Sequence, residues 1–600
     1  MHVRPTVLAP VLVSVLILGL PAKSPGGTLG ASPAHASGIP TVHSLHHLGP
    51  LVQLPGSLLP KLRSAHRLAP LEASRTLGLT ISLWVRDQAG LDGFLSSLYN
   101  RSSPLYHHFL TPEQFARRFA PTRATQQLVI QWLRSKHLRV VQRSRNGLLL
   151  TVRASLGRLE SAFGTRVFQY SQGTHRFFAN DRPVQIPQSL ASVITAVAGF
   201  SDRNRVHSQI HVVHAHSRSD DLAGYGPSDL QNLYDLTQFY QNSLNGAGQT
   251  IGLYESCDYS QANVATYDDN FGISDSSSAT ARVLVSDGKD SGAPLDAGQT
   301  ECELDIEMIH AIAPAVHVLV YEAPSTDAGS IALWNKIVSD DAASVVSTSW
   351  GAAETSLSTD LIHAIHQALQ EAAAQGQSVF DASGDLGAYD EAGDTSVPDS
   401  EWTNLVVDYP AADPYVTSVG GTTLYANADG SYHSEIAWSD ATRKPNAGSG
   451  GGLSTIFKRP DYQTGPGVSN QYSNGMRQVP DVAADADAQR SPYAIYSVDD
   501  QGKSGWLGVG GTSAAAPLWA AYTALINQYW GQSVGFLNPT LYALGHQASS
   551  LAFSPFHDIT KGDNLYYPAT PGWDFATGWG SMDGVAFVNG LLQLGGTVSQ

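Results

Sequence analysis

Cysteine is nearly absent from this 600-residue chain, which contains only Cys257 and Cys302. Two cysteines are too few for a disulfide framework, and their spacing forms no zinc motif. Two alternatives remain open for the pair: a disulfide, which export would permit, or two free buried thiols. Cys257 follows Glu255 and Cys302 follows Glu301, two candidate site residues, so the pair could be close in space.

Charged residues are also scarce, at 14% of the chain against 42% hydrophobic residues, which excludes a disordered chain and provides for a large core. The length favours two or more domains. Residues 1–219 contain 24 basic and 7 acidic residues, whereas residues 220–600 contain 11 and 45. Opposite net charges predict two parts that attract each other near neutral pH. A nucleic-acid or membrane patch in the basic part is disfavoured, because its arginines are scattered.

Long apolar runs are missing, apart from Val7–Leu20 near the start. Arg4 precedes this run, and Ala34-His35-Ala36 offers a small-residue cleavage pattern after it. The pattern predicts an export signal at 1–36 and a secreted protein. The alternative is a retained anchor, although the run is short for a membrane span.

Residues 37–200 alternate strand-like and helix-like segments, which predicts an α+β domain. Leu77–Val85 and Leu148–Val152 are predicted strands, Thr111 is a predicted helix cap, and Leu159–Phe163 is a predicted short helix. Residues 201–222 lose the hydrophobic pattern and are predicted to form an exposed linker with the maturation cleavage region. This linker contains four histidines, His207, His211, His214 and His216.

From residue 223 onward, predicted strands alternate with helices, which indicates an α/β domain with a parallel sheet. Active sites of such sheets lie beyond the carboxyl ends of the strands. The predicted strands are Thr250–Tyr254, Val318–Tyr321, Ser344–Ser347 and Ser378–Phe380, and the predicted helices are Glu301–Ala313 and Leu361–Gln375.

The strongest motif is the segment GGTSAAAP around Ser513, followed by an apolar, helix-like run. Glycine allows close approach of another backbone, and a helix N-terminus favours negative charge nearby. These features suit a nucleophilic serine, but a serine that only caps the helix is an equal alternative.

A nucleophilic serine needs a base, yet none of the 21 histidines lies in a triad-like motif. Glu301 and Asp305 are four residues apart at the start of a predicted helix, so they share a face. Two close carboxyls can share a proton and serve as an acid/base pair at low pH. The alternative is acidic residues that merely favour the helix N-terminus.

Two further loops contain candidate site residues. Asp385, in the glycine-flanked segment SGDLG, is either a structural turn residue or a protonated acid that stabilises an oxyanion. Asp558 and Asp574 flank a loop near the C-terminus, and two carboxylates with loop carbonyls suit calcium.

Taken in order, these motifs resemble the sedolisins, or serine-carboxyl peptidases. SPLYHHFLTPEQFARRFAP from Ser103 resembles the activation propeptide of the kumamolisin-like members, and YGPSDLQNLYDL from Tyr225 resembles the start of the mature enzymes. The resemblance implies a subtilisin-like α/β catalytic domain with a central parallel sheet at 223–600. It also implies a ferredoxin-like α+β propeptide at 37–200.

The same resemblance implies a role for each site residue. Ser513 would be the nucleophile, Glu301 the general base, Asp305 the acid that orients it, and Asp385 the oxyanion acid. Glu255 and Trp350 would extend the proton network. One structural calcium ion would be bound by carboxylates and backbone carbonyls of Asp558, Ile559, Thr570, Gly572 and Asp574.

The implied function is a secreted, acid-active endopeptidase that forms an acyl-enzyme with protein or peptide substrates. Its own propeptide would inhibit it until self-cleavage at low pH, when protonated carboxylates and charged linker histidines loosen the propeptide's grip. We expect a monomer, with neither nucleic acid nor, after signal removal, a membrane as partner.

Three other functions are less consistent with the sequence. A Ser-His-Asp enzyme requires a histidine that cannot be placed. A non-catalytic cell-surface binding protein would typically have lost a catalytic residue, and a calcium-stabilised lectin-like protein would not explain the propeptide.

Overall fold

The computed structural model describes residues 48–595, except 61, 63–64, 174, 204–205, 214–223, 274–278, 287–294, 297, 393–399, 401, 444, 500 and 552. The predicted export signal at 1–36 lies outside the described residues, as does the start of the predicted propeptide. None of the described helices is both long and apolar enough to cross a bilayer.

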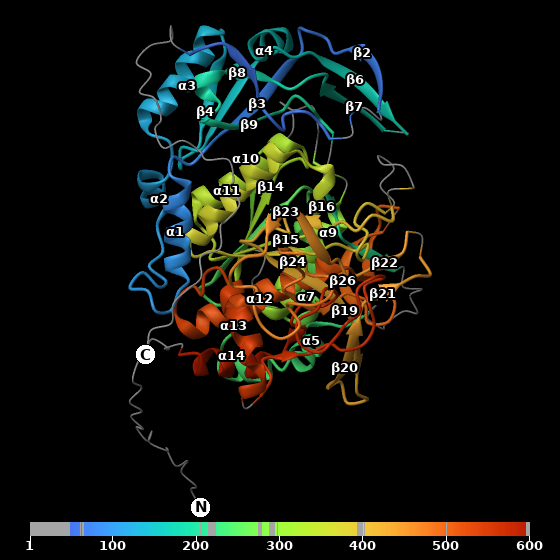
Figure 1. Ribbon diagram of the computed structural model, residues 1–600. Helices are drawn as coiled ribbons and strands as arrows, with labels where there is room; N and C mark the ends of the chain where they lie inside the picture. The colour runs from blue at the N-terminus through green and yellow to red at the C-terminus, as the bar shows by residue number, and fades with distance from the viewer. Residues whose placement is uncertain are drawn as a thin grey trace, which may run out of the picture. The chain divides into compact units, whose positions relative to one another are not determined.

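The front domain, blue to teal in Figure 1, is built on a four-stranded antiparallel sheet. Its strands follow the order β4 (Arg139–Arg143), β5 (Leu149–Ser155), β3 (Thr76–Leu83) and β9 (Ile194–Ala198). Helices α1 (Gln88–Leu98), α2 (Pro112–Arg118) and α3 (Arg123–Ser135) follow β3, and α4 (Leu156–Phe163) follows β5. This βαββαβ order, with the first strand between the third and the fourth, is the predicted ferredoxin-like arrangement.

Local sequence signals explain where these elements begin. Thr111 caps α2, because its hydroxyl accepts from the backbone N–H of Gln114 while the Gln114 side chain accepts from that of Thr111. Two smaller sheets extend the domain, β2 (His66–Pro70), β6 (Val167–Gln172) and β7 (His175–Asn180), and β1 (Leu51–Gln53) with β8 (Gln185–Pro187).

The catalytic domain contains the predicted parallel sheet. Its strand order is β13 (Thr280–Leu284), β14 (His317–Glu322), β12 (Thr250–Glu255), β15 (Val345–Thr348), β17 (Ser378–Ala382), β19 (Thr417–Ala426) and β20 (Tyr432–Ala437), and β25 (Val482–Asp485) also pairs with β19. Only β20 runs antiparallel to its neighbour in this sheet. The central strands β15 and β17 are buried along their whole length, as expected for a sheet covered on both faces.

Two pairs of helices flank the sheet. The helices α9 (Gln299–Ile312) and α12 (Thr512–Trp530) pack against each other, and α12 also contacts β15, β17 and β19. The second pair is α10 (Asp327–Asp340) and α11 (Thr359–Gln375), which ends at Gly376 in the left-handed region. Further elements are α5 (Pro227–Leu233), α6 (Thr237–Gln241), α7 (Gln261–Phe271), α13 (Asn538–Gln547), α14 (Gly584–Gln593), β21 (Ser439–Asp440), β22 (Ala447–Gly448), β23 (Gly452–Lys458), β24 (Met476–Val479), β26 (Tyr493–Val498), β28 (Phe556–His557) and β29 (Ser581–Met582).

The front domain docks on α11, which is yellow in Figure 1. The side chain of Gln367 accepts from the backbone N–H of Val85 at 2.8 Å, and Glu371 accepts from the Asn146 amide at 2.7 Å. An apolar cluster of Phe94, Phe115 and Phe119 from the front domain with Ala373, Ala374 and Phe536 completes this contact. The interface therefore combines buried amide hydrogen bonds with apolar packing.

The linker differs from its prediction. Strand β10 (His207–Ser208) pairs antiparallel with β16 (Trp350–Ala353), which also pairs with β18 (Asp408–Tyr409). Strand β11 (His211–Val213) pairs antiparallel with β27 (Ser504–Gly510), and Gln209 between the two is only 3% exposed. The prediction of an exposed linker is wrong for this stretch, because strand edges of the catalytic domain bind its backbone.

Candidate active site

The predicted catalytic residues lie together at one edge of the central sheet. Glu255 ends β12, Trp350 lies just beyond β15, and Asp385 lies just beyond β17. Glu301 and Ser513 lie in the first turns of the packed helices α9 and α12. Because neighbouring parallel strands end at this edge, it is the position where ligands bind in α/β sheets.

Ser513 is buried in the first turn of α12. Gly511 occupies the N-cap position, so Ser513 does not cap the helix and that alternative is wrong. The Ser513 hydroxyl lies beside the Glu301 carboxyl and lowers its pKa, although the two groups are not aligned as a hydrogen bond. Loose alignment of this kind is common before the substrate is bound for reaction.

Glu301, Asp305 and Glu255 form a chain of buried carboxyl groups leading away from Ser513. Burial, and then the neighbouring Asp305, raise the pKa of Glu301 well above its usual range. Burial and Glu255 do the same for the pKa of Asp305, whose Oδ1 also accepts from the Ser349 hydroxyl at 2.8 Å. Asp305 and Glu255 lie next to each other and perturb each other's pKa, and two carboxyls this close do not both ionise easily.

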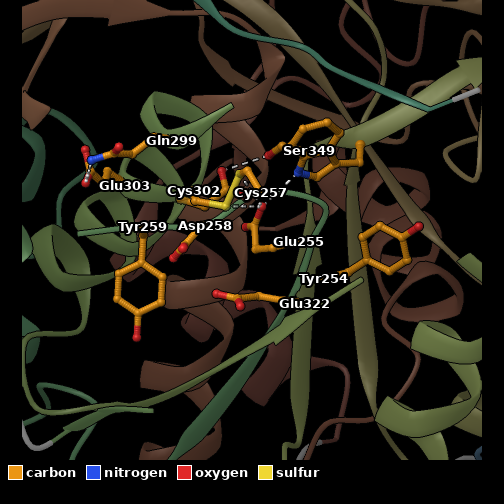
Figure 2. The surroundings of a disulfide bond; sticks show 12 residues. Tyr254, Glu255, Cys257, Asp258, Tyr259, Gln299, Cys302, Glu303, Glu322 and Ser349 are labelled. Carbon is orange, nitrogen blue, oxygen red and sulfur yellow. Dashed lines mark hydrogen bonds between the residues drawn. A yellow bond between two sulfur atoms is a disulfide. The ribbon is translucent and has the colours of Figure 1, made fainter. Parts of the chain in front are cut away.

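A disulfide covers the far end of this chain. Cys257 and Cys302 are bonded, which decides between the two alternatives left open by the sequence. Figure 2 shows Glu255 pointing toward the sulfur atoms, and its Oε2 is 3.2 Å from the Cys302 sulfur. The indole N–H of Trp350 donates to the same oxygen at 2.7 Å. Burial raises the pKa of Glu255 to about 8, and the Trp350 hydrogen bond limits the rise.

Asp385 is oriented by the residue before Ser513. The backbone N–H and the hydroxyl of Thr512 both donate to its Oδ1 at 2.7 Å. Burial raises the pKa of Asp385 to about 7, so the carboxyl is neutral in acid. Oδ2 accepts no hydrogen bond from the described residues and lies 3.2 Å from Nε2 of His211 in the linker. A neutral Asp385 can therefore donate a proton to a third group.

The linker passes directly over Ser513. The carbonyl oxygen of Gln209 accepts from the backbone N–H of Ser513 at 3.4 Å, and the N–H of Gln209 donates to the carbonyl of Ser349 at 3.2 Å. Gly511 has a φ of 106°, and a Cβ there would collide with the Gln209 carbonyl and with Asp385 Oδ2. Both groups therefore lie against the same side of Gly511.

Comparisons with known proteins agree with this geometry. Residues 63–203 match the family model of the pro-kumamolisin activation domain, and residues 290–580 match that of the subtilase family. Kumamolisin from Bacillus sp. (strain MN-32) is 37% identical over 457 residues, which cover 72% of this chain and 77% of kumamolisin. This chain belongs to the sedolisin family.

Sedolisin itself, from Pseudomonas sp. (strain 101), is 30% identical over 540 residues, which cover 87% of this chain and 88% of sedolisin. The solved structure of Pseudomonas sedolisin, a serine-carboxyl proteinase complexed with two molecules of pseudo-iodotyrostatin, aligns with a TM-score of 0.54 and 27% identity. The alignment covers 63% of this chain and all of that structure. The chain is thus a serine-type peptidase of the sedolisin family with an activation domain and a subtilisin-like catalytic fold.

Hydrogen bonds in the C-terminal loops of this sedolisin-family chain join four of the five predicted calcium ligands in two pairs, and Ile559 follows Asp558 in the chain. The backbone N–H of Gly572 donates to both carboxylate oxygens of Asp558, at 3.2 and 3.0 Å, and that of Thr570 donates to Asp574 at 2.9 Å. The carbonyls of Ile559, Thr570 and Gly572 accept no hydrogen bond from the described residues. Two carboxylates with spare carbonyl oxygens fit a calcium ion.

Sequence reasoning missed several residues of the site. Ser349 and Thr512 hold Asp305 and Asp385. Ser349 directly precedes Trp350, and Thr512 lies in the GGTSAAAP motif. Glu303 and Glu307, in the same helix as Glu301, are also buried, and they accept from the backbone N–H groups of residues 260 and 496. No local pattern distinguishes these contacts, which join segments far apart in sequence.

Gly511→Ala should sharply reduce peptide hydrolysis. The added methyl group would occupy the space of the Gln209 carbonyl, which is also the space for a substrate carbonyl. We expect a loss of at least about a hundredfold in kcat/KM, the usual effect of losing one oxyanion contact.

The matched control is Gly502→Ala, which also has positive φ, at 75°, but meets no atom within 4 Å. It should keep full activity and unfold at a higher temperature than Gly511→Ala, whose methyl group collides with the Gln209 carbonyl in the precursor, so the activity of Gly511→Ala is measured well below its own unfolding midpoint. Normal hydrolysis by Gly511→Ala would contradict the assignment of this space to the substrate carbonyl.

Proposed function

We propose that this sedolisin-family chain is the precursor of an exported endopeptidase that is active in acid, with Ser513 as nucleophile and Glu301 as its base. The observation that chiefly supports this is a peptide carbonyl held 3.4 Å from the Ser513 backbone nitrogen, beside a serine hydroxyl in contact with a buried carboxyl. A nucleophile, a base and an oxyanion donor thus surround one carbonyl, as acyl transfer requires.

Each group then has one task. Glu301 takes the proton of the Ser513 hydroxyl as its oxygen attacks the carbonyl carbon. Asp305 and Glu255 take up or share that proton within the buried chain. The chain thereby stabilises both the protonated and the ionised form of Glu301. The Ser513 backbone N–H and the protonated Asp385 donate to the oxygen as negative charge develops on it.

Preference for acid follows from Asp385. Its pKa, raised by burial to about 7, means that the donating form is present below that pH and is lost as pH rises through it. The activity should therefore fall on the neutral side, even where Ser513 and Glu301 are in place. No histidine is needed for this dependence.

The propeptide is proposed to inhibit the enzyme until the linker is cut by the enzyme itself. Glu371 at the docking face speaks against release by acid alone. Burial raises the pKa of Glu371 to about 8 in the docked state, so its contribution to docking is full below the usual pKa of a glutamate and is lost progressively as pH rises from there through about 8. Cleavage of the linker, which needs neutral Asp385, is then the step that responds to acid.

Export is proposed from the segment at 1–36 together with the Cys257–Cys302 disulfide, which persists in an oxidising compartment.

A structural calcium ion is proposed for the C-terminal loops, bound by Asp558 and Asp574 and by carbonyls of Ile559, Thr570 and Gly572. Such an ion would supply positive charge between the two carboxylates and fix the loops that contain them.

The test of the proposed function is hydrolysis of a denatured protein by wild type and by Ser513→Ala, after preincubation in acid, across acidic to neutral pH. We expect activity that declines as pH approaches about 7 and is absent in the variant. Activity that is highest at neutral pH, or that persists in Ser513→Ala, would reject the mechanism. Glu301→Gln should behave like Ser513→Ala, because the amide cannot accept the proton.

Thr512→Val should move the neutral limb of the pH profile to higher pH. The Thr512 hydroxyl donates to Asp385 and lowers its pKa, so its removal raises that pKa further and prolongs the donating form. A hydrogen bond to a charged group is worth about 1.5–3 kcal/mol, which corresponds to a shift of about one to two pH units. Thr512→Ser keeps the hydroxyl, so its activity should fall at the same pH as that of the wild type. If the activity of Thr512→Val also falls at the wild-type pH, Asp385 is not the group that sets this decline.

Calcium should stabilise the protein against unfolding. At a free concentration one hundred times Kd, a single bound ion adds about 2.7 kcal/mol to the free energy of unfolding. Thermal unfolding of the Ser513→Ala protein, with calcium or with a chelator, measures this effect. Asp574→Asn should abolish it, whereas Asp563→Asn, an exposed change in the same loop region, should not. If the midpoint temperature of unfolding is the same with calcium and with the chelator, the proposed calcium site is wrong.

A further inference from the structure

The linker lies over the active site in the manner of a bound peptide. On one side of Ser513, β10 pairs antiparallel with β16, so that Ser208 is opposite Trp350. On the other side, β11 pairs antiparallel with β27, so that His211 is opposite Gly510. The chain is therefore fixed on both sides, and only Gln209 and Ile210 lie between the two strands. Because the segment is held extended at both ends, only one of its peptide bonds lies at the nucleophile.

That position is the carbonyl of Gln209. Its oxygen is the one that accepts from the Ser513 backbone N–H, and its own N–H is fixed by the Ser349 carbonyl. The neighbouring residues use their backbones in the strand pairs with β16 and β27. The structure thus presents one peptide bond, Gln209–Ile210, to the Ser513 hydroxyl.

The Gln209 side chain is bound as specifically as its backbone. Its amide nitrogen donates to Asp408 Oδ2 at 3.1 Å, and its amide oxygen accepts from the Asp385 backbone N–H at 3.2 Å. We call these two partners the amide-binding site. One acceptor and one donor match the two ends of a carboxamide, and Asp408 is fully buried.

The surrounding backbone leaves room for Asp408 at this place. A Cβ on Gly351 would collide with Asp408 Oδ1, and one on Gly384 would lie 3.6 Å from the Asp408 Cβ. Burial, and then Asp390 and Asp381, raise the pKa of Asp408 well above its usual range. Asp408 is therefore neutral in acid and gives a buried cation no counter-charge, while a carboxylate would add to the repulsion, so the amide-binding site favours an uncharged partner such as the glutamine amide.

We propose that Gln209–Ile210 is the first bond that the precursor cleaves, within its own chain, and that Asp408 selects an uncharged hydrogen-bond donor in the residue before the cleaved bond. The proposal rests on the proposed function, since it uses Ser513 and Glu301 in the same roles. It adds the processing site and a specificity-determining residue outside the catalytic group.

The reaction is a hydrolysis and needs only water. The Ser513 oxygen bonds to the Gln209 carbonyl carbon while its proton moves to Glu301. The bond from that carbon to the Ile210 nitrogen then breaks, and Glu301 gives the proton to this nitrogen, which becomes a new amino terminus. Water next bonds to the same carbon, one of its protons passes through Glu301 to the Ser513 oxygen, and Gln209 is released as a new carboxyl terminus.

The first test follows the full-length precursor after transfer from neutral to acidic pH. Early products are analysed by intact mass and by sequencing of the new amino termini, at several protein concentrations, with Ser513→Ala as the uncleaved control. We expect Ile210 as the first new amino terminus, at a rate independent of concentration. A different first terminus, or a rate proportional to concentration, would overturn the proposal.

The second test changes the Gln209 side chain. Gln209→Leu keeps the length of the side chain but leaves the Asp385 N–H and Asp408 without their partners. Leaving buried polar groups unpaired slows the first cleavage by roughly tenfold to a hundredfold. Gln131→Leu, the same change on an exposed position of α3, should cleave at the wild-type rate. Equal rates for Gln209→Leu and wild type would reject the amide-binding site.

The third test uses the mature enzyme with two peptides of residues 206–213, one with glutamine and one with leucine at position 209. We expect kcat/KM to favour glutamine by about tenfold or more in wild type, and this preference to disappear in Asp408→Ala. A preference for leucine in wild type overturns the proposal, without requiring any variant to fold.

These outcomes separate the proposal from the proposed function. If protein hydrolysis in acid depends on Ser513 but the first terminus is not Ile210, only the assignment of this bond and of Asp408 fails. If no hydrolysis depends on Ser513, both fail.

Discussion

Carboxyl groups kept away from water are the constraint on which the rest of this structure depends. Glu301, Asp305, Glu255 and Asp385 are all buried, and burial is the main cause of the raised pKa of each. In water these groups would be ionised and would repel one another at the distances of a shared helix face. Because they are buried, they tend to hold protons instead, which is the property that the proposed mechanism uses in place of a histidine base.

The fold provides this burial by placing the carboxyls where several elements meet. Helices α9 and α12 pack against each other, so that their first turns lie together at the ends of the parallel strands. The disulfide joins the loop after β12 to the first turn of α9 and lies against Glu255 (Figure 2). It therefore links Glu255, at the end of the chain of carboxyls, to the turn that contains Glu301, the proposed base.

In the precursor, the linker lies across this same site. The linker crosses the candidate active site, and its strands complete two sheets of the catalytic domain. His211 of the linker lies next to Asp385 while Arg443 donates to its other ring nitrogen, so the linker contacts the acid that is proposed to stabilise the oxyanion. Burial, followed by Arg443, lowers the pKa of His211 to about 4, which keeps this histidine neutral near the Asp385 carboxyl over most of the acidic range. The predicted charging of linker histidines on mild acidification is therefore disfavoured at this position.

The sequence by itself determined the classes of element and the residue types of the site. Periodicity and caps placed β3, α2, β12 and α11 within a few residues, because these signals are local. The motifs around Ser513, Glu301 and Asp385 were recognisable for the same reason, since glycine, serine and paired carboxylates at fixed spacing restrict the chemistry that they allow.

Only the tertiary structure decided which distant groups meet. The disulfide, the Ser349 and Thr512 hydrogen bonds and the burial of Glu303 and Glu307 all join segments far apart in the chain. The linker was misjudged because its polar residues resemble a solvated loop, whereas strand edges more than a hundred residues away pair with its backbone. Backbone hydrogen bonds between strands do not depend on side-chain polarity, so composition alone could not reveal that this segment lies across the active site.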